Sequence, residues 1–197
     1  CVFCQNNNIA NAKVGKKISV ERLAEIFLEQ QDRGALNINL VTPTHYIPQI
    51  IKALELSKNQ GMNLPVVYNS GGYEKAEALK LLDGLVDVYL PDMKYMSPGL
   101  AGKYSKAQDY PAAAMAALAE MFRQVGTPVF EVEKPDDNTA TDEAGLIMKR
   151  GMIVRHLVLP GCTADSKAVV KYLYDTYGDD IYMSIMSQYT PMPELMP

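Results

Sequence analysis

Two cysteines stand close together at the start of the sequence. Cys1 and Cys4 form a Cys-x-x-Cys pair, and a polar run, Gln-Asn-Asn-Asn, follows it. Two thiolates at this spacing can ligate one metal centre from a tight loop. The same spacing also occurs in half of a zinc site, in a redox dithiol, or by chance. Metal ligation is the interpretation we favour for Cys1 and Cys4.

The cysteine count indicates the redox environment. Cys162 brings the total to three, which is an odd number. In a chain without secretory features, an odd count argues against a disulfide framework and favours a reducing compartment. We therefore expect a cytoplasmic protein. Because the sequence begins with Cys1 and not with Met, we interpret it as truncated at its N-terminus.

Composition excludes two classes of partner. The formal net charge is −4 with a pI near 5.2, and the sequence has no basic stripe of the kind that nucleic-acid binding needs. No apolar run approaches the roughly 20 residues that span a bilayer. The chain has 197 residues, of which 48% are hydrophobic, so one domain over 1–197 is expected.

Five apolar runs rich in β-forming residues predict strands. Their hydrophobicity is nearly continuous, which is typical of parallel strands covered on both faces. The run that precedes Asp92 (VDVYL) and the run that contains Arg155 (IVRHLVL) are examples. The predicted strands are 36–42, 64–70, 86–92, 153–159 and 181–187.

Helical patterns separate these runs. Ser19 is expected to cap a helix that ends near Asp32, and further helices are expected at about 48–59, 74–82, 111–124 and 165–177. In the second, Ile51, Leu54 and Leu56 should face the core. The alternation predicts an α/β fold with a parallel sheet, either doubly wound or barrel-like. A β-hairpin excursion is expected at about 127–150.

Polar residues gather where the predicted strands end. Ligands of parallel α/β proteins bind outside the carboxyl ends of the strands, so these residues should share one site. Both charge signs are present, which suits a small zwitterionic ligand. The candidates are Thr42, Thr44, His45, Asn69, Ser70, Asp92, Lys94, Arg155 and Gln188.

Six segments carry a resemblance to a known family. In order they are CVFCQN, NINLVTPTHY, VVYNSGGY, DVYLPDMKY, MIVRHLVLPG and MSIMSQYTP. The chain resembles radical S-adenosylmethionine proteins related to the pyruvate formate-lyase activating enzyme, and most of all their uncharacterised activating-enzyme-like relatives. The resemblance implies a partial (β/α)6 TIM-like barrel of parallel strands, with the first strand lost upstream of residue 1.

The resemblance also implies cofactors and partners. The family holds a [4Fe-4S] cluster with a Cys-x-x-x-Cys-x-x-Cys motif, and Cys1 and Cys4 match its second and third cysteines. The reduced cluster cleaves S-adenosylmethionine to a 5′-deoxyadenosyl radical, which abstracts hydrogen from a substrate. Implied partners are a reducing electron donor and, in the best-known branch, a glycyl-radical enzyme as protein substrate. Lacking one ligand and one strand, this chain should bind a cluster poorly.

The resemblance assigns roles to several strand-end residues. Asp92 and Lys94 match a D-x-K motif near S-adenosylmethionine, and Arg155 matches an arginine suited to a carboxylate. Asn69 and Ser70 stand where relatives contact the cofactor's polar atoms. Thr42 and Thr44 replace a GGE stretch that contacts the methionine amino group, and Gln188 replaces a histidine. No residue is assigned as catalytic.

Other interpretations remain open. His156 is expected to be a structural histidine of an apolar strand, and Cys162 an ordinary loop residue. Asp92 and Lys94 could form a plain surface ion pair. One alternative function is an iron-independent barrel enzyme that uses Asp92, Lys94 and His156 for acid–base chemistry. Another is a non-catalytic metal-binding fragment.

Overall fold

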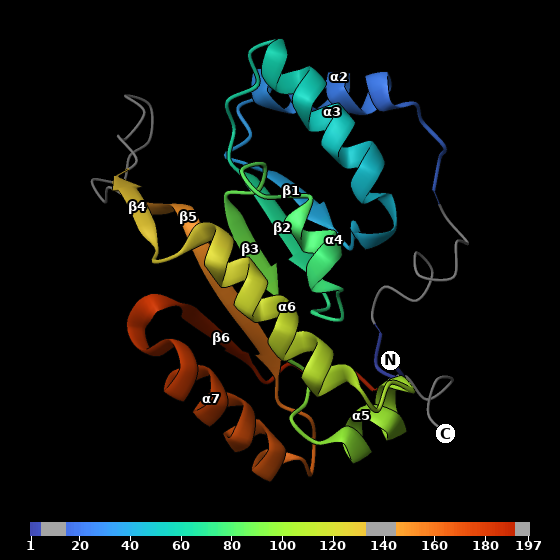
Figure 1. Cartoon of the computed structure of the whole chain (residues 1–197), viewed down its shortest axis with the longest axis vertical. Coiled ribbons are helices and arrows are strands. Elements are labelled where there is room, and N and C mark those ends of the chain that lie inside the picture. Colours follow the sequence, from blue (N-terminus) through green and yellow to red (C-terminus); the bar gives the residue numbers. More distant parts are fainter. Residues whose placement is uncertain (5–14, 133–144, 192–197) are drawn as a thin grey trace.

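The structure is a computed structural model that describes residues 1–4, 15–132 and 145–191. Helices and strands alternate along most of it (Figure 1). The strands are β1 (Ile38–Val41), β2 (Val66–Ser70), β3 (Val88–Pro91), β4 (Val129–Val132), β5 (Leu146–Leu157) and β6 (Tyr182–Met186). The helices are α2 (Val20–Asp32), α3 (Ile47–Asn59), α4 (Ala76–Lys80), α5 (Pro98–Ser105), α6 (Tyr110–Val125) and α7 (Thr163–Tyr177), with 3-10 turns at Thr44–Tyr46 and Gly178–Asp180.

The strands form one sheet in which parallel pairing dominates. β1, β2, β3, β5 and β6 pair in parallel, each with the preceding member of this series. The predicted α/β fold with parallel strands is therefore confirmed. The strand order shows no reversal of the kind found in doubly wound sheets, and the sheet is not closed.

The hairpin excursion is also confirmed. β4 pairs antiparallel with the first part of β5, from Leu146 to Arg150. The returning hairpin strand and the fourth predicted parallel strand are one continuous 12-residue element. Its first part pairs with β4, and its last part, from Ile153, pairs with β6. The segment 133–144, which we expected to be a polar loop, lies outside the described residues.

The helices pack on the sheet through a shared apolar core. α6 lies on β3 and β5, α7 packs on β5, and α2 lies beside α3 (Figure 1). Alternate residues of β2 point into this core. Val66 and Tyr68 are therefore fully buried, whereas Asn69, which follows Tyr68, is only half-buried. This alternation decides which strand residues are free to face a ligand.

Most predicted helix limits agree with the structure. Ser19 caps α2, since its hydroxyl accepts a hydrogen bond from the Arg22 amide at 3.1 Å. The expectation for Leu56 is wrong, because this side chain is 36% exposed. The buried face of α3 follows Ile47, Ile50, Leu54 and Ser57, and position 56 falls beside that stripe.

One helix was not predicted. α5 begins with Ser97 as its cap, whose hydroxyl accepts from the Leu100 amide at 3.3 Å, and Pro98 follows at the first helical position. The Asp165 carboxylate at the start of α7 accepts from the Ser97 amide at 2.7 Å, which ties the two helices together. The Ser-Pro pair was the signal in the sequence.

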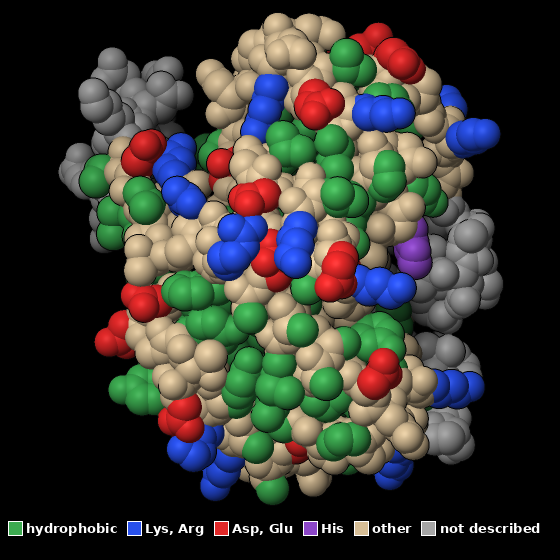
Figure 2. Space-filling view, in the orientation of Figure 1, with side chains coloured by type: hydrophobic (Ala, Val, Ile, Leu, Met, Phe, Trp, Pro, Cys, Tyr) green, Lys and Arg blue, Asp and Glu red, His purple; other side chains and the backbone are tan. Residues whose placement is uncertain are grey.

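The helices of the described residues are all too short or too polar to cross a bilayer. Acidic and basic side chains are interspersed on the face shown in Figure 2.

Candidate functional site

A cavity of about 530 Å³ lies at the carboxyl ends of the five parallel strands. Each of these strands contributes to its wall, and so does the N-terminal segment that carries the two cysteines. The expectation that strand-end residues share one site is thus met for most of the candidates. The lining residues that the sequence singled out are Cys1, Cys4, Thr42, Asn69, Ser70, Asp92, Lys94, Arg155 and Gln188.

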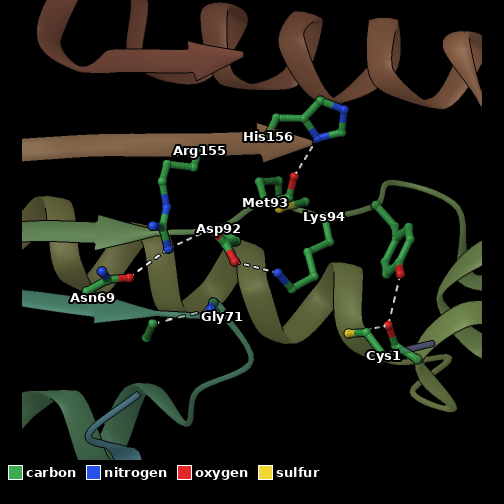
Figure 3. Close-up of polar contacts among 12 residues, drawn as sticks. Cys1, Asn69, Gly71, Asp92, Met93, Lys94, Arg155 and His156 are labelled. Atoms are coloured by element: carbon green, nitrogen blue, oxygen red, sulfur yellow. Dashed lines mark hydrogen bonds and ion pairs between the residues drawn. The ribbon is translucent and has the colours of Figure 1, made fainter. Parts of the chain in front are cut away.

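Three charged side chains form the polar centre of the cavity. Asp92 lies between Arg155 and Lys94 (Figure 3). Its Oδ1 accepts from Arg155 Nη2 at 2.9 Å, and its Oδ2 pairs with Lys94 Nζ. The three side chains are only 17–26% exposed. Because two cations share one carboxylate, the cluster has one positive charge in excess, which favours an anionic group such as a carboxylate.

Arg155 also reaches across the sheet. Its Nη2 donates to Asn69 Oδ1 at 2.6 Å, so the network connects β5, β3 and β2. The Arg155 Nε is buried and has no hydrogen-bond partner among the described residues. A buried donor without a partner is costly, and a ligand carboxylate or a water can satisfy it. The donor chemistry of the site therefore fits a ligand carboxylate.

The backbone holds Asp92 next to Arg155. The Met93 amide donates to the Arg155 carbonyl at 2.9 Å, and the Asp92 amide donates to the Ser70 carbonyl at 3.0 Å. These bonds continue the pairing of β3 with both neighbouring strands past the end of the strand. The charged side chain is consequently fixed by regular sheet geometry rather than by a free loop.

Gly72 and Tyr110 pack against the backbone of the wall residues Gly71 and Asp92. A Cβ on Gly72 would lie 2.1 Å from the Asp92 carbonyl oxygen, and the residue has a φ of +77°, so only glycine fits. The buried Tyr110 hydroxyl lies 2.9 Å from the Gly71 carbonyl and 2.8 Å from the Asp92 carbonyl, and it accepts from the Lys94 amide at 3.0 Å. Burial raises the pKa of Tyr110, so this hydroxyl stays neutral.

The cysteine segment packs against α5. The Val2 amide donates to the Tyr104 carbonyl at 2.9 Å, and the Cys4 amide to the Cys1 carbonyl at 3.3 Å, which closes a turn. Ser105 Oγ donates to Cys1 Sγ at 2.9 Å. Cys1 is exposed and Cys4 is half-buried. The two thiols thus face the cavity from a segment that is anchored to the helix.

The Ser105 hydroxyl is itself held by a second side chain. Tyr95 Oη lies 2.9 Å from Ser105 Oγ, and the ring of Tyr95 packs edge-on against Phe3. Burial raises the pKa of Tyr95 to about 12, so its proton remains available for a hydrogen bond.

Metal ligation at the cavity wall depends on the two cysteines. Groups of three or more His, Cys, Asp or Glu side chains suited to a metal do not occur in the parts of the chain that the structure describes. Cys1 and Cys4 supply two thiols at one wall. This donor set fits part of an iron–sulfur ligand set, in which a further thiolate completes the coordination.

Thr42 and Thr44 lie in different environments. Thr42 lines the cavity and has a left-handed backbone, with a φ of 53°. Thr44 is not among the lining residues, because its hydroxyl turns away and donates to Glu74 Oε1 at 2.6 Å. The structure therefore brings only the first of these two candidates to the site.

His156 and Cys162 lie away from the cavity. His156 is 3% exposed, and its Nδ1 lies 2.7 Å from the Met93 carbonyl (Figure 3). It lines a second hollow, beneath α7, on the side of β5 opposite to Arg155. Cys162 stands at the start of α7. This placement supports the structural interpretation of His156 and leaves Asp92 and Lys94 without the histidine that the acid–base alternative requires.

Sequence reasoning did not identify three residues that shape the site. Ser105 is the partner of Cys1, Tyr110 supports the wall, and Glu74 is the buried partner of Thr44. For Tyr110 the signal was weak, since it stands before a proline at the start of an Ala-rich helix. The glutamate after the Gly-Gly pair was a clearer signal, because a carboxyl so close to a strand end is a candidate for a structural contact.

No family model matches the chain. The chain is similar to the uncharacterized protein MJ0674 of Methanocaldococcus jannaschii, with 29% identity over 205 residues. That similarity covers 97% of this chain and 50% of the relative. The chain thus spans about half the length of the curated relative it matches. Because that relative is uncharacterized, the likeness assigns no activity.

Proposed function

We propose that the protein is a radical S-adenosylmethionine oxidoreductase related to the pyruvate formate-lyase activating enzyme. One observation carries the proposal: Cys1 and Cys4 line the same cavity as the charged cluster of Asp92, Lys94 and Arg155. A thiolate-ligated iron site next to a pocket for a zwitterionic amino acid is the arrangement that this chemistry needs. Two separate sites would have removed the basis of the proposal.

The fold is consistent with this function. Five parallel strands follow each other in chain order, which is the order of a (β/α) barrel, and the sheet is open. We interpret it as a partial (β/α)6 barrel whose first strand would pair beside β1. The cavity at the carboxyl ends of the strands then corresponds to the usual ligand position of such barrels.

Each polar residue of the cavity has a role in the proposal. Arg155 and Lys94 bind the carboxylate of S-adenosylmethionine, and Asp92 holds both cations in place and accepts from its ammonium group. The side chain of Asn69 orients Arg155. Cys1 and Cys4 hold a [4Fe-4S] cluster together with a third thiolate. When bound, the cluster supplies the electron that cleaves the sulfonium to a 5′-deoxyadenosyl radical.

Apolar side chains form a further part of the cavity wall. Val41, Leu157 and Met186 line it from β1, β5 and β6, and Leu159 follows just after β5. Such side chains exclude water from a reactive radical. The exposure of Cys1 leaves the cysteine segment accessible to a reducing electron donor. A glycyl-radical enzyme is the substrate that the proposal favours.

The first experiment loads the protein with iron and sulfide under anaerobic conditions. We expect absorbance near roughly 400 nm from a thiolate-bound cluster at low occupancy, because Cys1 and Cys4 supply only two of its three thiolates. The variants C1S and C4S should each lose this absorbance and the bound iron, whereas C162S should retain both. Zinc at one equivalent without iron would contradict the proposal, and so would equal iron retention in all three variants.

The second experiment measures chemistry. With a strong one-electron reductant, a loaded protein should convert S-adenosylmethionine to 5′-deoxyadenosine and methionine. The activity of the 197-residue chain should be low, because Cys1 and Cys4 supply only two of the three thiolates that the proposal needs. A protein that binds iron but forms no 5′-deoxyadenosine would exclude this function.

A further inference from the structure

A buried carboxyl connects the two loops that form one wall of the cavity. Glu74 lies between β2 and α4 and is 5% exposed. Its Oε1 accepts from the Thr44 hydroxyl, in the loop after β1, at 2.6 Å. Its Oε2 and the Tyr68 hydroxyl are both buried and have no hydrogen-bond partner among the described residues. A buried carboxyl with one unpaired oxygen costs stability.

The loop that Glu74 holds contains a strained residue. Thr42 has a φ of 53°, which is unfavourable for a β-branched side chain. Its amide donates to the Asn69 carbonyl at 2.7 Å, and it lines the cavity next to Asn69. A conformation of this kind persists only when neighbouring contacts hold it, and such residues are concentrated at functional sites.

We propose that Glu74 is a positioning residue that acts through Thr44 to hold Thr42 in its left-handed conformation at the wall of the cavity. The Thr44 hydroxyl connects the two residues. Thr44 follows Thr42 by two positions, and its hydroxyl donates the hydrogen bond that ties the loop to Glu74. The hydrogen bond between Thr44 and Glu74, which lies outside the cavity, thereby offsets the backbone strain at Thr42. Ligand affinity then depends on a residue that never touches the ligand.

The surroundings of Glu74 are consistent with a strong contact. Burial raises the pKa of Glu74, while the hydrogen bond from Thr44, the nearby Ser70 and Tyr68 hydroxyls and the charge of His45 lower it. These groups come from the β1–α3 loop and from β2, which are the elements packed against the carboxyl. Thr44 donates to an oxygen of either protonation state, so the link to the loop does not require ionisation.

The first test follows the amide of Thr42 by hydrogen exchange in the whole chain without ligand. T44V removes the hydroxyl at nearly constant volume, and the exchange rate should rise about tenfold or more. E74L should have the same effect, whereas E74Q keeps a carbonyl acceptor for Thr44 and should exchange within about threefold of wild type. If E74L does not fold, the comparison of T44V with E74Q decides.

The second test distinguishes strain relief from general loosening. In a T42G background the left-handed conformation carries no steric penalty. The T44V substitution should then accelerate exchange at position 42 by less than about threefold, compared with the larger factor in wild type. The proposal is overturned if T44V has no effect on exchange, or if its effect is equally large in both backgrounds.

The consequence for ligand binding rests on the proposed function. The S-adenosylmethionine affinity of T44V should fall about fivefold to tenfold, and the ratio between T42G/T44V and T42G should be close to one. If wild type does not bind S-adenosylmethionine, the proposed function fails while the exchange result still decides the role of Glu74. If wild type binds it and T44V binds equally well, the positioning role is wrong.

Discussion

Two adjacent residues of β5 face two different hollows. Arg155 points into the cavity at the strand ends, and His156 points to the opposite side, beneath α7 (Figure 3). The volumes are similar, about 530 Å³ and about 460 Å³. The contacts of the two side chains differ. Arg155 binds the side chains of Asn69 and Asp92, which come from two other segments, whereas His156 contacts one backbone carbonyl.

This difference shows that volume alone does not identify a site. In the cavity, charged groups with buried or half-buried side chains converge from separate elements. Removing these charges from water costs free energy, and such convergent polar groups are typical of ligand sites. In the second hollow, Val158, Val170 and Ile185 supply apolar surface, and His156 is held by a structural contact. We therefore expect substitutions on the two sides of β5 to have different consequences.

The largest expected effect concerns the wall of the cavity. G72A places a Cβ 2.1 Å from the Asp92 carbonyl oxygen at a φ of +77°, so it should lower the free energy of unfolding by about 3 kcal/mol or more. G71A is the matched control, because the nearest atom to its Cβ would be Lys94 Cε at 3.8 Å. Urea unfolding of both variants measures the difference, and equal midpoints would contradict the close packing of this wall.

A crossed pair of substitutions tests the comparison directly. On the proposed function, R155L should weaken S-adenosylmethionine binding by about 100-fold, since it removes charge-assisted hydrogen bonds worth about 1.5–3 kcal/mol each. R155K should recover part of this loss, because lysine keeps the positive charge but lacks the planar guanidinium that donates two parallel hydrogen bonds. H156L should leave binding within about twofold of wild type.

The same pair should behave in the opposite way in unfolding experiments. H156L leaves the buried Met93 carbonyl without its donor, which should cost about 2 kcal/mol of stability. Isothermal titration calorimetry gives the ligand affinity, and urea unfolding of the same preparations gives the free energy of unfolding. A binding defect in H156L as large as that in R155L would mean that the two sides of β5 are not functionally distinct.

A smaller effect is expected at Tyr110, which supports the backbone of the cavity wall. Y110F removes a buried hydroxyl that contacts the Gly71 and Asp92 carbonyls and the Lys94 amide, which should cost about 1–2 kcal/mol. Y73F removes an exposed contact with Asp109 and should leave the unfolding midpoint unchanged. If Y110F is as stable as Y73F, then the Tyr110 hydroxyl does not support this wall.

The smallest effect is a pH dependence at Glu74. Its pKa is raised in the folded protein above the ordinary value of 4.5, chiefly by burial. The folded state therefore binds a proton more tightly than the unfolded chain, and stability from this group is lost as pH rises from about 4.5 through the raised pKa. E74Q lacks this titration, so its stability relative to wild type should increase over that window. Urea midpoints of the two proteins between about pH 4 and 8 test the sign.

The sequence predicted the framework better than the details of the site. All five parallel strands and the hairpin were predicted, because long apolar runs and their polar ends are local signals. The side that each residue faces is less visible in a continuous apolar run. Arg155 and His156 are adjacent, and only the pairing of β5 with its neighbours shows which of them faces the cavity.

Contacts between distant segments were beyond prediction. The bond from Ser105 to Cys1 and that from Thr44 to Glu74 depend on how loops pack, which propensity and periodicity do not encode. Thr44 was assigned to the ligand by position alone, but it begins a 3-10 turn that rotates its hydroxyl toward Glu74. Helix α5 was overlooked because it is short and has a weak apolar pattern.

The chain order of the parallel strands also bears on how the molecule assembles. Each of these strands pairs with the one that precedes it in the series, so the sheet can grow by one strand at a time as the chain leaves the ribosome. Gln188 and Met186 belong to the last part of the described chain, yet they complete the cavity wall. The pocket is thus the final product of this growth, and a chain interrupted before β6 would have a partly formed sheet without a closed binding surface.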